Sequence, residues 1–136
     1  MLLDITHARL KHLEWELHLE EILQGRKKAT TVSTHDECML GRWLYNEGLA
    51  KHSSIPELAL LEREHKAFHR LARQVLNEHK VGNHEKARET FSEVKWLSKE
   101  IIFLLTFIEL AVLNKQKKYY AIRHPLKSLK GLFSKK

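Results

Sequence analysis

The chain has 136 residues and a formal net charge of +7 at pH 7. This length suits one domain with its own core. Two prolines and five glycines are too few to punctuate a many-stranded sheet, so we expect an all-α fold and argue against an all-β one.

The positive charge is concentrated at the C-terminal end. Residues 115–136 hold eight Lys or Arg and no acid, which leaves 16 basic and 17 acidic residues before them. Because the body is near neutral, we expect no nucleic-acid function. The N-terminus does not resemble a signal peptide, and a single cysteine cannot form an intramolecular disulfide. We therefore expect a cytoplasmic protein.

The first half of the chain predicts one long and one short helix. The long one covers about residues 2–23 and ends before Gly25. The short one covers about residues 36–45 and closes near Gly48, with Thr34 as its N-cap. Between them lies a polar loop.

The second half predicts two long helices. Pro56 marks the start of the first, which should stop near Gly82. The second opens around Asn83 and reaches at least Asn114. Its apolar run, residues 101–113, is well short of the ~20 residues that cross a bilayer, so we expect a buried helix.

We expect these helices to form an antiparallel four-helix bundle, with a short extra helix that carries the cysteine motif. Residues 1–114 would be the bundle and residues 115–136 a basic, partly amphipathic tail. The first helix has a second apolar face opposite its core face, which favours a homodimer. That outer face comprises Leu3, Leu10, Leu13 and Leu17.

Two histidines on the third helix, His65 and His69, are four residues apart and therefore project from one face. His65 lies in the apolar seam of that face. Because burying an imidazole without a partner costs free energy, something must bind these nitrogens. A metal ion would do so. Taken alone, the spacing is also compatible with histidines that only bond to protein oxygens.

Two further residues could complete such a site. His12 lies in an apolar seam of the first helix, although by itself that position favours a core histidine bonded to a backbone or side-chain oxygen. Cys38 is the only cysteine, and a free cysteine is often just a small buried apolar residue. The four side chains can converge only if the bundle folds around them.

The residues carry a resemblance to a known family. His-x-x-Trp (His12, Trp15), Cys-x-Leu-Gly-x-Trp-Leu-Tyr (from Cys38 to Tyr45) and His-x-x-x-His (His65, His69) together resemble the chemoreceptor zinc-binding (CZB) domain. The resemblance covers about residues 1–112, and the cysteine motif is its most specific part.

The resemblance implies a bacterial helical bundle whose zinc is held by three histidines and one cysteine. It is usually a homodimer attached to chemoreceptors or diguanylate cyclases. Carried onto matching positions, the zinc ligands are His12, Cys38, His65 and His69. Four protein ligands leave no open position for a substrate water, so we expect a sensor of zinc or of cysteine oxidation and not an enzyme. For His35 we favour a solvated residue at the start of the short helix over a supporting group or a substitute ligand.

The sequence leaves two other functions open. One is a dimeric adaptor in which zinc is purely structural. The other, less favoured, is a di-iron oxygen-binding bundle, because Glu62-x-x-His65 and His12-x-x-x-Glu16 are fragments of its motifs. The chain contains no cyclase or chemoreceptor signalling motif, so we expect it to act on a signalling partner in trans.

The tail suits an anionic membrane surface or an acidic partner, because lysines accompany an apolar stripe there. This would place the protein in the cytoplasm or at the inner surface of the membrane. The tail lysines beside the stripe are Lys127, Lys130, Lys135 and Lys136.

Overall fold

The computed structural model describes residues 5–123, and over this range every regular element is helical. The predicted all-α class is thereby confirmed. None of the helices within these residues is long and apolar enough to span a membrane. The elements in chain order are α1 (Ile5–Leu23), α2 (Met39–Trp43), the π-helical turn η1 (Leu44–Gly48), α3 (Leu49–Lys51), α4 (Glu57–Lys80) and α5 (His84–Arg123).

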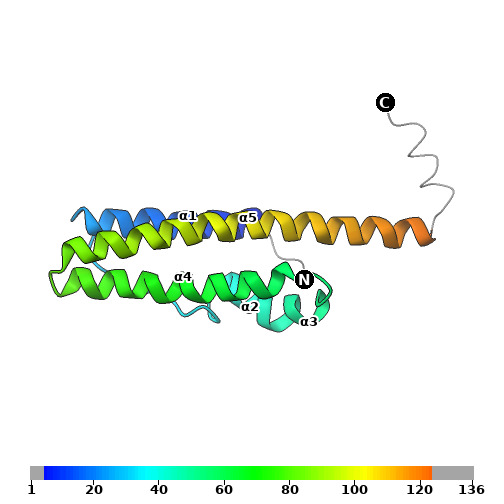
Figure 1. The fold of residues 1–136 in the computed structure, drawn as a ribbon, viewed down its shortest axis with the longest axis horizontal. Helices are drawn as coiled ribbons and strands as arrows, with labels where there is room; N and C mark the ends of the chain where they lie inside the picture. Colours follow the sequence, from blue (N-terminus) through cyan, green and yellow to red (C-terminus); the bar gives the residue numbers. More distant parts are fainter. Residues whose placement is uncertain (1–4, 124–136) are drawn as a thin grey trace, which may run out of the picture.

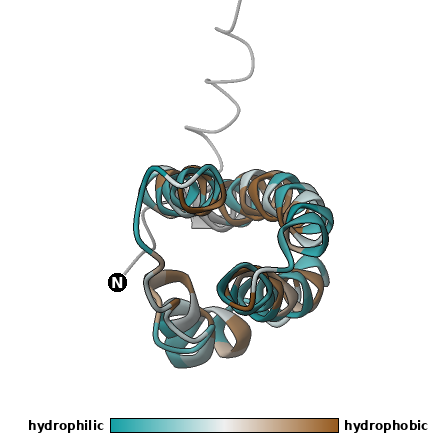
Figure 2. Cartoon of the chain, turned by 90° about the vertical axis from the view of Figure 1, so that its left-hand side faces the viewer, coloured by the Kyte–Doolittle hydropathy of each residue, from teal (hydrophilic) through white to brown (hydrophobic). Residues whose placement is uncertain are grey.

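Three long helices, α1, α4 and α5, run side by side (Figure 1). Seen end-on, a fourth corner is filled by the short helical turns α2, η1 and α3, which follow one another without a break (Figure 2). We call residues 38–52 the cysteine segment. The short helix thus stands beside three long helices in the described part of the chain.

The core lies between the long helices and follows from their apolar periodicity. On α4, buried positions recur at spacings of three and four, as a helix with one apolar face requires. Leu19 of α1, Phe68 of α4 and Leu105 of α5 are among the side chains fully excluded from water. Burying a side chain of this kind stabilises the fold by roughly 1.5–3 kcal/mol.

The ends of α1 and α4 agree with the sequence-based expectation. Gly25 and Gly82 have φ angles of 75° and 83°, in the left-handed region that glycine adopts without strain. After α4, the amide of Gly82 donates to the carbonyl of His79 and that of Asn83 to the carbonyl of Glu78. These bonds satisfy the last carbonyls of the helix and turn the chain into α5.

The cysteine segment differs from expectation at both ends. Its N-cap is Cys38, whose sulfur accepts the amide of Gly41 at 3.4 Å, and not Thr34. The helical path also continues through Gly48 to Lys51. Gly48 is needed for a different reason, because a Cβ there would lie 2.6 Å from the indole ring of Trp43.

The last helix is longer than the minimum predicted. It runs to Arg123, through the expected domain boundary after residue 114, so that boundary stays a prediction. The tail lysines named above lie outside the described residues. In Figure 1 the C-terminal part of α5 projects beyond the other helices.

Candidate metal centre

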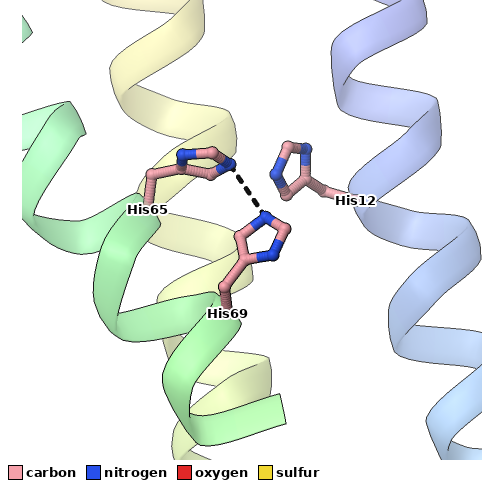
Figure 3. A group of neighbouring side chains, drawn as sticks. All are labelled: His12, His65 and His69. Atoms are coloured by element: carbon pink, nitrogen blue, oxygen red, sulfur yellow. Dashed lines mark hydrogen bonds between the residues drawn. The ribbon is translucent and has the colours of Figure 1, made fainter. Parts of the chain in front are cut away.

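Three histidines from two helices meet in the interior. His12 projects from α1, whereas His65 and His69 project from successive turns of α4 (Figure 3). One ring nitrogen of each lies within 4.8 Å of the others. The three residues are only 5%, 1% and 2% exposed, in chain order. Such burial of three imidazoles without a shared ligand would be unfavourable.

Cys38 places its sulfur beside one of these histidines. Its Sγ lies 3.2 Å from Nε2 of His65, and Nε2 of His65 lies 3.0 Å from Nε2 of His69. Cys38 is half-buried. Among the described residues, only the three histidine nitrogens form a group within 4.8 Å of one another, and the sulfur joins that group through its contact with His65. The four residues that the sequence predicted as a site thus lie in one region, between α1, the start of the cysteine segment and α4.

Backbone carbonyls fix the orientation of two of the rings. Nδ1 of His12 lies 2.8 Å from the carbonyl oxygen of Ala8, one turn earlier on α1. Nδ1 of His69 lies 2.6 Å from the carbonyl oxygen of Ser33, in the loop before the cysteine segment. Since a carbonyl can only accept, both Nδ1 atoms carry the proton and donate it. Each ring then presents the lone pair of its Nε2 to the cluster.

The interior also keeps the imidazoles uncharged. Burial lowers the pKa of His65 to about 2, with further lowering from the neighbouring histidines. Burial likewise lowers the pKa of His69 to about 4, although its bond to Ser33 opposes this, and it lowers that of His12. Neutral imidazoles are the form that binds metal.

The Cys38 thiol, in contrast, is not in its metal-binding form before metal binds. Burial raises the pKa of Cys38, while the amides of Gly41 and Leu40 act in the opposite direction. A proton therefore occupies the sulfur at neutral pH, and metal binding must displace it.

The donor set fits one tetrahedral ion of the zinc type. Bond lengths of about 2.0–2.3 Å place tetrahedral nitrogen and sulfur donors roughly 3.3–3.8 Å apart, close to the separations of 3.0 and 3.2 Å observed here. Nitrogen and thiolate donors are those that zinc prefers. In addition, Nδ1 of His65 is buried with no hydrogen-bond partner among the described residues, so the polar contacts of this ring all lie at Nε2, next to the other donors.

Other residues that sequence reasoning considered do not join the group. His35 is half-buried and its ring packs edge-on against Tyr45 at 5.9 Å between centroids. Glu62 forms an ion pair with Lys66 at 3.6 Å. Glu16 interacts electrostatically with Lys95 and Lys99 of α5. Within residues 5–123 the only group of three or more potential ligands is the histidine cluster, so the carboxylates of a di-iron site are not assembled.

Sequence reasoning missed the backbone partners of the site. The carbonyl of Ser33 accepts a hydrogen bond from His69 on α4, 36 residues further along the chain. No pattern of side chains in the sequence predicts this bond. The bond from Ala8 to His12 could have been anticipated, because the carbonyl four residues earlier is always near a helical side chain.

Comparison with known proteins agrees with this chemistry. Residues 12–76, which contain all four donors, match the family model of the chemoreceptor zinc-binding domain. That domain binds zinc, and zinc is the ion that the donor set fits. No curated protein and no solved structure matches the chain.

Proposed function

As residues 12–76 carry the chemoreceptor zinc-binding domain, we propose that this protein is a zinc-dependent regulatory module. His12, Cys38, His65 and His69 are its ligands. It senses zinc or the oxidation of Cys38 and acts on a signalling partner of the chemoreceptor or diguanylate cyclase type. The matched family is regulatory and not a known catalytic one, and four protein ligands leave no position for a substrate water.

The observation that carries this proposal is the convergence of the donors from separate elements. Two come from α4, whose buried face extends from Leu58 to Leu76, and one comes from α1. The fourth, Cys38, begins a segment that reaches the core mainly through Leu40 and Leu44, with Leu49 packed against it further along. A bound zinc would supply a thiolate link between this segment and α4.

The cysteine segment is therefore the part that responds. Removal of zinc, or oxidation of the Cys38 sulfur, takes away that link. What remains is the packing of Leu40, Leu44, Trp43 and Leu49 on the core. The bond that His69 donates to the carbonyl of Ser33 also remains. The cysteine segment then shifts from a docked form toward a more mobile one. The signalling partner responds to this change in the segment.

Hydrogen exchange tests this directly. In zinc-loaded protein, amides of residues 35–48 should be protected, and a chelator should increase their exchange while α4 and α5 stay protected. The control is the same chelator added to Cys38→Ala, in which the segment is already unlinked and should respond little. Unchanged exchange of residues 35–48 in wild-type protein would rule the mechanism out.

A second surface supports a homodimer, the assembly that we propose. Apolar side chains are exposed at helical spacing on α1 and on the neighbouring α5, and Arg9 of α1 bonds to Thr106 of α5 at 2.8 Å, which sets these helices side by side. We call this surface the α1/α5 face. It comprises Leu10, Leu13, Leu17, Trp96, Phe103, Phe107 and Leu110.

An adaptor with purely structural zinc is the alternative. The deep burial of the three histidines favours it, because tightly buried ligands exchange slowly. Chelation distinguishes the two functions: a sensor releases zinc and stays folded, whereas a structural site unfolds when zinc leaves. Membrane or partner binding by the tail lysines belongs to either function and is tested by vesicle sedimentation of the full chain.

A further inference from the structure

A cavity of about 210 Å³ opens beside the metal centre. Three of the four proposed ligands, His12, Cys38 and His69, line it, whereas His65 does not. The donor set thus borders a cavity whose walls come from α1, α4, the loop at Ser33 and the start of the cysteine segment. A purely closed site would have side chains in this place.

The size of the cavity limits what can enter it. An apolar cavity of about 150 Å³ is known to hold benzene, so this one admits a molecule of about six to ten non-hydrogen atoms. Peptides and large chelators do not fit. Apart from the ligands and Ser33, its walls are formed by Ala8, Trp15, Met39, Leu40 and Phe68, which suit an apolar or weakly polar body.

One cation also lines the cavity. Lys11 belongs to the lining, and its side chain is 55% exposed, so it stands where the cavity meets solvent. Its partner Glu14 lies 3.5 Å away and is even more exposed, so this pair is weak and leaves the ammonium able to attract an anion. The lining contains no acidic side chain.

We propose that this cavity binds a small organic anion, a thiolate or a carboxylate, whose donor atom competes with Cys38 for the zinc. The inference rests on the proposed function and adds a ligand to it. An incoming thiol would give up its proton to the Cys38 sulfur as that sulfur leaves the metal. An incoming carboxylate carries no proton, so the Cys38 sulfur would take one from water instead, and charge and protons balance in both cases. The cysteine segment is released while the three histidines keep the ion.

The test is the rate at which zinc passes from the loaded protein to excess EDTA, with and without a small anion. 3-Mercaptopropionate and propionate are the two probes, since they differ only in the thiol, and glutathione is the probe that is too large. In wild-type protein we expect at least one small anion to accelerate transfer about threefold or more. Glutathione at equal thiol concentration should accelerate it far less.

Two substitutions localise the effect. Lys11→Glu should abolish most of the acceleration, whereas Lys86→Glu should not, although Lys86 also pairs with a glutamate three residues on and is 54% exposed. Met39→Ala widens the lining and should increase the acceleration. Three results would each overturn the inference. Glutathione could accelerate transfer as much as the small thiol does, the two lysine variants could behave alike, or no probe could accelerate transfer in wild-type protein.

This outcome is separable from that of the proposed function. If purified protein contains no zinc, the metal centre itself is wrong. If it contains zinc and transfers it at a rate that no small anion changes, only the cavity site is wrong.

Discussion

The sulfur of Cys38 lies 3.2 Å from Nε2 of His65, although 27 residues separate them in the chain. This contact joins the start of the cysteine segment to the middle of α4. A change at the Cys38 sulfur would therefore act directly on the cysteine segment, the element that we propose to move.

Removing that sulfur should weaken the centre more than it weakens the fold. We expect Cys38→Ala to lower zinc affinity by about a hundredfold or more, because three donors and a water replace four protein donors. His65→Ala should do the same. Competition titration against a coloured chelator measures the affinity. His84→Ala, an exposed histidine next to the α4–α5 turn, is the control and should bind zinc like wild type.

The metal-free protein should lose stability as the pH falls. The folded pKa values of His65 and His69, about 2 and about 4, lie below the ordinary value of 6.5, so the unfolded chain binds more protons below pH 6.5. The stability is fully present above pH 6.5 and is lost progressively toward pH 4 and below. From pH 7.5 to 5 each imidazole contributes a loss of up to ~2 kcal/mol. Urea unfolding at these two pH values measures it.

The histidine origin of this pH dependence can be checked by substitution. His69→Gln removes one titrating group, so the difference in unfolding free energy between pH 7.5 and 5 should shrink. An equal pH dependence in wild type and His69→Gln would assign the effect to other groups.

Gly41 should be intolerant of a side chain. A Cβ at Gly41 would overlap the backbone carbonyl of His35 and lie 3.0 Å from the Cα of Asp36. Gly41→Ala must displace the loop that delivers Cys38, so we expect a loss of about 1–3 kcal/mol of stability together with weaker zinc binding. Gly25→Ala provides the comparison, since it meets only a strained φ with open space around it. It should lose stability but bind zinc normally.

The α1/α5 face should control the oligomeric state. Leu13→Glu with Phe107→Glu places two charges on it, and we expect a dimer to become a monomer, because charges are poorly tolerated in the centre of an interface. Light scattering after gel filtration measures the mass. Val81→Glu is the control, because Val81 is 79% exposed but lies at the α4–α5 turn. A wild-type monomer would contradict the proposed assembly.

The sequence allowed the helices and the three clustered histidines to be predicted from short-range patterns, whereas the assignment of four ligands came from the resemblance to a family and stays a prediction. The spacing of His65 and His69 and the seam position of His12 are properties of single helices. Left-handed glycines at positions 25 and 82 likewise leave a local signal. The cysteine motif was informative through resemblance to a family and not through its own periodicity.

The details of the cysteine segment could not be predicted, because they depend on distant contacts. Rules for helix starts prefer threonine, yet Cys38 caps the helix, with its sulfur next to His65 on another helix. Gly48 looked like a helix end, but its role is to make room for the Trp43 ring. Neither relationship is visible before the tertiary packing is known.

The proposed ligands all come from the first 69 residues, so α5 takes no part in the centre and is held by packing on α4 and α1. This division has a consequence for how the molecule assembles. The α4–α5 hairpin has only a tight turn to close and can form early, before any ion is captured. The N-terminal helix can pack on this hairpin through Leu19 and Ile22 without an ion. Metal supply would therefore govern the docking of the cysteine segment, the final step of maturation and not its beginning.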